Sequence, residues 1–237
     1  MILCVRIPWF RLSAALRRAV SPHESAFLID RPLRGRVVEA TDPVLAAGVR
    51  VGMDARQALR WVPFGRMVLD EPAAAALRWD AVLSLLTAVA PVEDGGLGRA
   101  FLRLDEDEEE PAAWFGPVRD ALRPSGLPVC LGAAVNRFVA QVATYRGGGG
   151  AVCPPGREAT FVADAPLERL ELDEDALLRL RLLGVRTLGD FTVLPPSYLE
   201  RFGPEAVRWF ALAHGIDDPA VTVRRVPPRL RAVHKGR

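Results

Sequence analysis

Lysine is almost missing from this sequence of 237 residues, since Lys235 is its only lysine. Arginine therefore carries nearly all of the positive charge, and its planar guanidinium suits bidentate contacts to phosphate. A genome rich in G and C is the simpler cause of this bias. The formal net charge is only +2, so composition alone does not indicate a nucleic-acid partner.

Cysteine and long apolar runs are also scarce. The three cysteines are far apart and form no CxxC pair, so we expect neither a disulfide framework nor a zinc site: Cys4, Cys130 and Cys153. The first ten residues contain Arg6 and Pro8 and make a poor signal peptide. The most apolar segment, residues 73–92, contains Arg78 and Asp80, which predicts a buried helix and not a membrane span. We expect a soluble protein of a reducing cytoplasm.

Segments with the periodicity of strands and of helices alternate over the first two thirds of the chain. Strands are predicted at about residues 1–7, 26–30, 36–41, 99–104 and 127–135, with a last strand or pair of strands within 150–164. Helices are predicted at about residues 9–20, 43–63 (as two short helices), 72–89, 112–126 and 136–146. From residue 166 to 215 the pattern is wholly helical. This order predicts an α+β module followed by a small helical module.

The stretch GGLGRAFLRLD, residues 95–105, predicts a strand with two different faces. One face carries alanine and leucine, and the other carries Arg99, Phe101 and Arg103, because strand side chains alternate. Two arginines beside an aromatic ring on an open face suggest contact with an anion. The acidic run Asp105–Glu110 is interpreted as a solvated loop and not as a metal site.

Several aromatic residues occupy apolar helical positions and are expected in the core: Trp61, Trp79, Trp114, Phe138 and Trp209. The segment QALRW, which begins at Gln57, is expected to be buried with them. It is therefore not interpreted as a peptide that binds a sliding clamp.

Five segments, taken in order along the chain, resemble the Y-family (translesion) DNA polymerases, and most closely the catalytically inactive ImuB-like proteins. They are AAGVRVGMDARQALRWVP, LPVCLGAAVNRFVAQVAT, VCPPGREATFVADAPLERL, RLRLLGVRTLGDFTVLP and FGPEAVRWFALAHGIDDPAV. The resemblance implies an α+β fold with a ferredoxin-like palm, small α/β fingers and a helical thumb of the helix-hairpin-helix type. The implied ranges are 1–10 (palm strand), 11–66 (fingers), 67–165 (palm), 166–220 (thumb) and 221–237 (basic tail or linker). The little-finger domain that follows the thumb in the family is expected to be lacking.

The resemblance also implies that the chemistry of the family is lost. A two-metal polymerase needs carboxylates that hold divalent ions against the triphosphate and the primer hydroxyl. The matching positions here are Arg6, Gly98 and Arg99. The family's triphosphate-binding tyrosine and arginine match Asp42 and Leu45. We therefore expect no catalytic residue, no metal and no cofactor.

Arg6 and Arg99 are expected side by side on adjacent strands, where they either hold a DNA phosphate or are merely solvated. The hairpin around Gly184, with Arg186, Thr187 and Gly189, is either a phosphate-binding turn or a purely structural one. The predicted DNA-binding residues are Arg6, Arg99, Arg103, Gly184, Arg186, Thr187, Gly189, Arg224 and Arg225.

The function implied by the resemblance is that of an accessory or adaptor protein in DNA damage-induced mutagenesis and translesion synthesis. Its partners would be primer–template DNA, an error-prone polymerase, a RecA-like protein and the sliding clamp, with no membrane, in a cytoplasm near the nucleoid. Two alternatives stay open. One is a residual nucleotidyltransferase that uses Asp94 or Asp105, and the other is a DNA-binding module without a protein partner.

Overall fold

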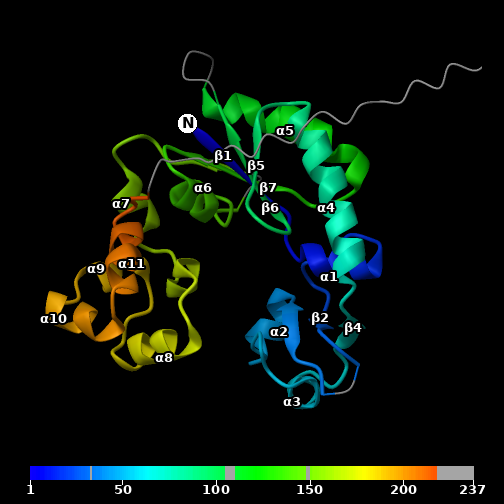
Figure 1. Ribbon diagram of the computed structural model, residues 1–237, viewed down its shortest axis with the longest axis horizontal. Coiled ribbons are helices and arrows are strands. Elements are labelled where there is room, and N and C mark those ends of the chain that lie inside the picture. The colour runs from blue at the N-terminus through cyan, green and yellow to red at the C-terminus, as the bar shows by residue number, and fades with distance from the viewer. Residues whose placement is uncertain (33, 105–109, 148–149, 218–237) are drawn as a thin grey trace, which may run out of the picture.

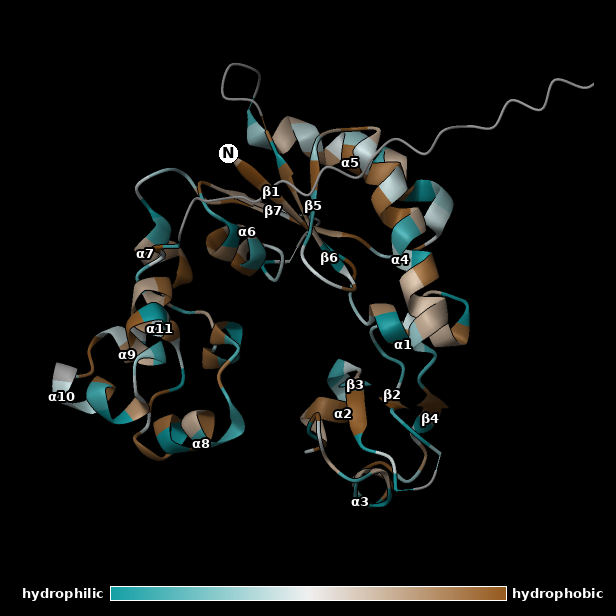
Figure 2. Cartoon of the chain, viewed as in Figure 1, coloured by the Kyte–Doolittle hydropathy of each residue, from teal (hydrophilic) through white to brown (hydrophobic). Residues whose placement is uncertain are grey.

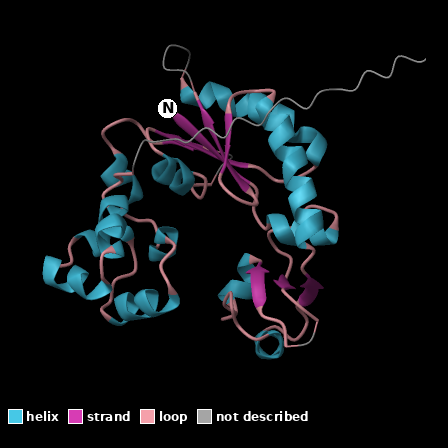
Figure 3. Cartoon of the chain, in the orientation of Figure 1, coloured by secondary structure: helices cyan, strands magenta, loops and turns pink. Residues whose placement is uncertain are grey.

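The computed structural model describes residues 1–32, 34–104, 110–147 and 150–217. Its larger sheet, the main sheet, has five strands in the order β5-β6-β1-β7-β8 (Figure 3). The central strand β1 is antiparallel to both of its neighbours, and β8 is parallel to β7. The strands are β1 (Ile2–Arg6), β5 (Val92–Asp94), β6 (Arg99–Arg103), β7 (Cys130–Ala134) and β8 (Ala151–Val152).

Two helices, α4 (Pro72–Thr87) and α5 (Phe115–Leu122), cover one face of the main sheet. Apolar residues of β1, such as Leu3 and Val5, pack there against Trp79 and Val118. Residues 10–69 are inserted between β1 and α4. Without this insertion, the order of the main elements is strand, helix, strand, strand, helix, strand over β1, α4, β5, β6, α5 and β7. This arrangement is the ferredoxin-like βαββαβ unit, as predicted.

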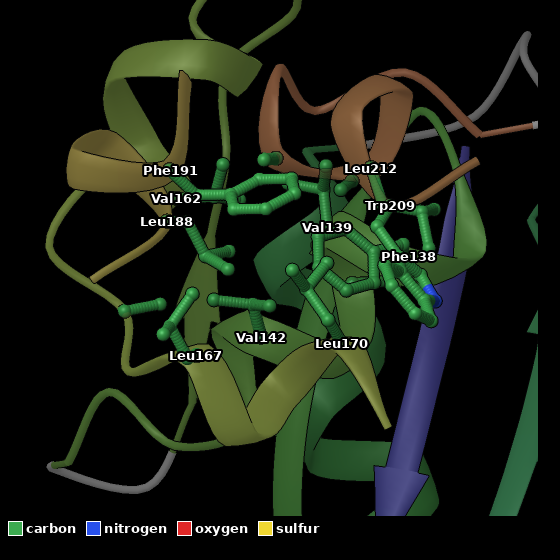
Figure 4. Close-up of a cluster of buried hydrophobic side chains, with 14 of the residues drawn as sticks. Phe138, Val139, Val142, Val162, Leu167, Leu170, Leu188, Phe191, Trp209 and Leu212 are labelled. Carbon is green, nitrogen blue, oxygen red and sulfur yellow. The ribbon is translucent and has the colours of Figure 1, made fainter. Parts of the chain in front are cut away.

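Helix α6 (Arg137–Ala143) lies on the opposite face of the main sheet, close to β7. The C-terminal helices, residues 158–217, pack against α6 in one buried cluster, which Figure 4 shows with Phe138 and Val139 facing Leu170, Phe191 and Trp209. These helices are α7 (Glu158–Val162), η3 (Leu167–Leu170), α8 (Glu174–Leu182), α9 (Leu188–Thr192), α10 (Pro196–Leu199), η4 (Glu200–Phe202) and α11 (Glu205–Ala213).

A second sheet, the small sheet, has three strands in the order β3-β2-β4 and lies apart from the C-terminal helices (Figure 1). Its own core contains Phe27 and Ile29 of β2, which pack with Val44 and Ala58 of two short helices. Its strands and helices are β2 (Ala26–Ile29), β3 (Val37–Ala40), β4 (Arg66–Leu69), α2 (Asp42–Ala46) and α3 (Ala55–Trp61), and α1 (Phe10–Leu16) connects it to the main sheet. Figure 2 shows β1 and β3 as apolar strands, in keeping with their buried positions.

Some expected elements differ from the structure. The strands β4 and β5 were not predicted, and the segment 150–164 forms only the two-residue β8 before helix α7. Two 3₁₀ turns flank α5, at Pro111–Trp114 and Arg123–Ser125. None of the helices among the described residues combines the length and the hydropathy of a membrane span.

Two predictions about side chains are wrong. The face of β6 that carries Phe101 is not open, because Phe101 is 7% exposed and packs with Phe138 of α6. The segment QALRW is not buried as a whole, since Gln57 is exposed and Trp61 is 56% exposed. Here α3 covers its own small sheet with the buried Ala55 and Ala58 and the partly buried Leu59.

Candidate nucleic-acid site at the end of the central strand

Arg6 and Arg99 are direct neighbours across β1 and β6, as the sequence predicted. Residues opposite each other in an antiparallel pair project from the same face of the sheet, and like charges in this position repel. The pair therefore has to be stabilised by other groups. Each arginine has its own set of partners.

The guanidinium of Arg6 is held by the end of α6. Its Nε donates to Thr144 Oγ1 at 2.9 Å, and its Nη2 donates to the Thr144 carbonyl at 3.2 Å. Its central carbon lies 3.9 Å from the centroid of the Tyr145 ring. The same ring receives Arg169 of η3 at 3.3 Å. We name these three residues, Arg6, Tyr145 and Arg169, the arginine–tyrosine stack.

The stack joins the main sheet to the C-terminal helices through cation–π contacts. Burial lowers the pKa of Arg169, and the nearby charge of Arg6 lowers it further. Arginine stays protonated despite such shifts. The stack therefore places two positive charges around one aromatic ring.

Arg99 also reaches the C-terminal helices. Its Nε donates to the Gly95 carbonyl at 3.0 Å, and its Nη1 donates to Glu171 Oε1 at 2.8 Å. Glu171 follows η3 and has a left-handed backbone with φ of 52°, which is strained for a residue other than glycine. Both arginines thus link the end of the main sheet to one turn of the C-terminal helices.

Two cavities meet at these residues. One, of about 370 Å³, is lined by residues that include Arg6, Trp9, Glu39, Gly98, Arg99 and Tyr145. The other, of about 300 Å³, lies between the main sheet and the C-terminal helices and is lined by residues that include Arg99, Arg137, Arg169, Glu171, Arg208 and Trp209. Arg99 and Gln141 line both cavities, and we call the place where the cavities meet the junction. Arginine side chains line the cavities on both sides of it.

The other carboxylates near this end of the main sheet, apart from Glu171, are engaged by neighbouring groups and do not converge with one another. Asp94 Oδ1 accepts hydrogen bonds from Trp79 Nε1 at 2.8 Å and from the Gly96 N–H at 2.9 Å. Glu39 accepts the Leu12 N–H at 2.7 Å, and burial raises the pKa of its carboxyl. Within the described ranges, no three His, Cys, Asp or Glu side chains are grouped so that they could hold a metal ion.

Gly98 leaves no room for a carboxylate side chain. Its φ is +85°, and a Cβ atom built there would lie 2.8 Å from Phe10 Cβ and 3.1 Å from the Ile7 carbonyl. The Gly98 carbonyl also accepts the Ile7 N–H at 2.8 Å. With Gly98 in this turn and guanidinium groups at Arg6 and Arg99, the residues of this site do not fit a divalent ion.

Comparison with known proteins agrees with this architecture. The chain is 29% identical over 199 residues to DNA polymerase IV 2 of Mycobacterium tuberculosis (79% of the chain, 56% of the relative). It is 31% identical over 183 residues to protein ImuB of Caulobacter vibrioides (75% of the chain, 40% of the relative). The chain thus spans about half the length of such relatives. No family model matches it.

Solved structures give the fold. DinB from Sulfolobus solfataricus aligns with a TM-score of 0.70 at 18% identity, over 90% of this chain and 66% of that one. An insertion ternary complex of Dbh DNA polymerase aligns with a TM-score of 0.66 at 19% identity, with the same coverage. The chain is a relative of the Y-family DNA polymerases. Its α+β fold is that of the Y-family core, as the sequence predicted.

The predicted phosphate-binding hairpin of this Y-family relative uses its backbone N–H groups internally. The N–H groups of Arg186 and Thr187 both donate to Asp190 Oδ2 at 3.0 Å. Those of Leu188 and Gly189 donate to the carbonyls of Ala165 and Ala163. These backbone hydrogen bonds lower the pKa of Asp190, so a negative charge occupies the position that a phosphate would need. The geometry favours the structural interpretation of this hairpin.

The remaining predicted site residues are spread out or outside the described ranges. Arg103 is exposed at the far end of β6, opposite Ile2 and away from Arg6. Arg224, Arg225 and Asp105 lie outside the described residues. Sequence reasoning missed Tyr145, Arg169 and Glu171, because these residues are distant in sequence from Arg6 and Arg99 and come close to them only when the chain folds. The doublet of Tyr145 and Arg146 after an apolar helix was the only local signal.

Proposed function

We propose that this chain is a non-catalytic relative of the Y-family polymerases that acts as an accessory protein in translesion synthesis. Its curated relatives are named DNA polymerase IV and ImuB, which supports a role in the replication of damaged DNA. The observation that carries the proposal is the pairing of Arg6 with Arg99 beside Gly98. By resemblance, these are the positions of the family's metal-binding carboxylates.

Electrostatics supports the loss of chemistry. On an order-of-magnitude Coulomb estimate, Arg6 and Arg99 would repel a neighbouring divalent ion by several kcal/mol in a poorly screened cleft. The nearest acid, Glu171, is already paired with Arg99. The site thus offers positive charge where a polymerase needs negative charge, and positive charge suits a DNA phosphate.

DNA binding at this junction is the second part of the proposal. Arg6 and Arg99 each use only some of their five N–H donors within the protein, so donors remain for a phosphate oxygen. Anisotropy of labelled primer–template DNA over a salt series measures this contact. We expect Arg6→Ala with Arg99→Ala to weaken binding and to reduce the salt slope by about 2, roughly one for each lost phosphate contact.

The matched control is Arg6→Lys with Arg99→Lys, which keeps both charges while removing the planar fork. This variant should retain most of the salt slope. If the alanine and the wild-type proteins bind primer–template DNA with the same affinity and slope, then this junction is not the DNA site.

A residual nucleotidyltransferase that uses Asp94 is the first alternative. The carboxylate of Asp94 is engaged by the Trp79 indole and the Gly96 N–H, which accounts for it as a structural group. This alternative requires metal-dependent primer extension that Asp94→Ala abolishes.

A DNA-binding module without a protein partner is the second alternative. It shares the salt-dependent DNA affinity but forms no stable complex with proteins from damaged cells. Association with an error-prone polymerase, a RecA-like protein, the sliding clamp and the nucleoid stays a prediction. So does the division of the chain into palm, fingers, thumb and tail.

A further inference from the structure

Two large aromatic side chains lie exposed at the end of α3, far along the chain from Arg6 and Arg99. Trp61 is the last residue of α3 and is 56% exposed, and Phe64 is 101% exposed. A tight turn connects them, in which the Gly65 N–H donates to the Val62 carbonyl at 2.9 Å. Exposed aromatic groups of this size usually mark a contact surface.

The indole of Trp61 rests against the backbone at Gly48. A Cβ atom at Gly48 would lie 3.0 Å from Trp61 Cε3, and Gly48 has a φ of +108° that favours glycine. The protein therefore supports one side of the ring and leaves more than half of the side chain accessible. This is the arrangement of a stacking platform, in which a flat group can be added on the accessible side.

The surroundings of the two rings are positive. Arg56 and Arg60 are exposed on α3, one turn apart, and Arg66 begins β4. Among the described residues, none of these three arginines has a carboxylate within ion-pair distance. The one acid within residues 43–69, Asp54, accepts the N–H groups of Arg56 and Gln57 as the N-cap of α3.

We infer that Trp61 and Phe64, with Arg56, Arg60 and Arg66, form a binding surface for single-stranded nucleic acid. Unpaired bases stack on aromatic rings irrespective of sequence, while arginines contact the phosphates between them. Bases inside a duplex are already stacked and cannot use these rings. Arg66 lies near enough to Glu24 to lower the pKa of that carboxyl, so Arg56 and Arg60 carry the excess of positive charge. This excess favours a polyanion over an apolar protein segment as the occupant.

The test uses the full chain and a fluorescein-labelled twelve-residue oligo-dT, followed by anisotropy at several salt concentrations. Trp61→Ala and Phe64→Ala should each weaken binding by at least about fivefold, because loss of a stacked base typically costs about 1–3 kcal/mol. Trp61→Phe should restore most of the affinity. Arg56→Ala with Arg60→Ala should reduce the salt slope by about 1.4, or 0.7 per phosphate.

Matched controls come from other parts of the chain. Val207→Ala removes an exposed apolar side chain of α11, and Arg119→Ala with Arg123→Ala removes one arginine of α5 and one of the 3₁₀ turn that follows it. These changes should leave oligo-dT binding within about twofold. Phe64→Ala keeps the test valid if Trp61→Ala fails to fold, since Phe64 is fully exposed.

The inference is overturned if Phe64→Ala and Trp61→Ala both bind oligo-dT like the wild-type protein. It is also overturned if duplex of the same length competes as well as the single strand. Loss of primer–template binding in the Arg6 and Arg99 variant concerns the other site, so the two proposals can fail separately.

Discussion

At the scale of single residues, the most informative feature is the pair Arg6 and Arg99. Two arginines opposite each other on a sheet are unfavourable unless other groups compensate. Here Tyr145 offers its ring to Arg6, and Glu171 offers its carboxylate to Arg99. Tyr145 lies between α6 and β8, and Glu171 follows η3. Tyr145 also contacts Arg169 of η3, so the repulsion is relieved by contacts that also position the C-terminal helices.

The arginine–tyrosine stack predicts a difference between two substitutions of Tyr145. Tyr145→Ala removes the ring from between Arg6 and Arg169 and should lower the free energy of unfolding by about 1–2 kcal/mol, since exposed cation–π contacts contribute roughly 0.5–1 kcal/mol each. Tyr145→Phe keeps the ring and should cost less than about 0.5 kcal/mol. Urea unfolding of the two variants measures this. Equal losses in both would show that the ring contacts contribute nothing.

Glu39 predicts a specific pH dependence. Burial, and to a smaller degree Asp70, raises the pKa of this carboxyl above its ordinary value of 4.5, although Arg11 and the Leu12 N–H oppose the shift. The folded protein therefore binds a proton more tightly than the unfolded chain does. Stability contributed by this group is full below pH 4.5 and is lost as pH rises through the raised pKa of the folded state.

Glu39→Gln removes this titration while its amide oxygen can still accept the Leu12 N–H. We expect the variant to gain stability relative to wild type as pH rises from about 4.5 toward neutrality. Thermal unfolding at a series of pH values gives the difference between the two proteins. A difference that stays constant with pH would contradict the assignment.

At the scale of elements, the packing of α6 on β7 depends on one glycine. A Cβ atom at Gly132 would lie 2.3 Å from the Ala140 carbonyl oxygen and 2.6 Å from the Thr144 nitrogen. The backbone of α6 therefore approaches β7 directly. The same approach brings Thr144 and Tyr145 to Arg6, so the site depends on this contact.

Gly132→Ala should destabilise the protein by at least about 1–3 kcal/mol, because the added methyl group meets backbone atoms that cannot move aside. Gly116→Ala is the matched control, since nothing lies within 4 Å of a Cβ atom there and the residue is in helix α5. The control should be neutral or slightly stabilising. Chemical denaturation of both variants distinguishes a steric effect at Gly132 from the general effect of replacing a glycine by alanine.

Much of the fold was predictable from the sequence because its strands and helices are strongly patterned. The strand β1, the helix α4 and the helix α6 have continuous apolar or periodic segments that local reasoning detects. The strand β4 was missed because most of its side chains are exposed, and β5 because it has only three residues. Trp61 was placed in the core because its helical spacing matches a buried face, whereas the structure leaves that side of α3 open.

The candidate site was predictable only in part. The pairing of Arg6 and Arg99 was expected because the resemblance to the Y-family palm places their strands side by side, and the structure pairs them. The contacts to Tyr145, Arg169 and Glu171 join segments that are distant in sequence, and no local periodicity indicates them. The loss of space at Gly98 depends on Phe10 of α1, which only the folded structure places against that turn.

At the scale of the whole molecule, the small sheet and the C-terminal helices flank the main sheet (Figure 1). The arginines that line the two cavities converge where β1 ends. This is the architecture of a Y-family core with arginines lining its central junction. We propose a separation in which the shape of the core is retained and its metal-dependent chemistry is lost.

The most direct test of that separation is extension of a labelled primer on a template, with all four deoxynucleotides and either Mg²⁺ or Mn²⁺. A homologous Y-family polymerase serves as the positive control, and the protein is supplied in excess over the primer so that even one slow addition is visible. We expect no added nucleotide with either metal, although the protein binds the same DNA in the salt series. Metal-dependent extension that is lost on Asp94→Ala would contradict this expectation and would place the chain among the active polymerases.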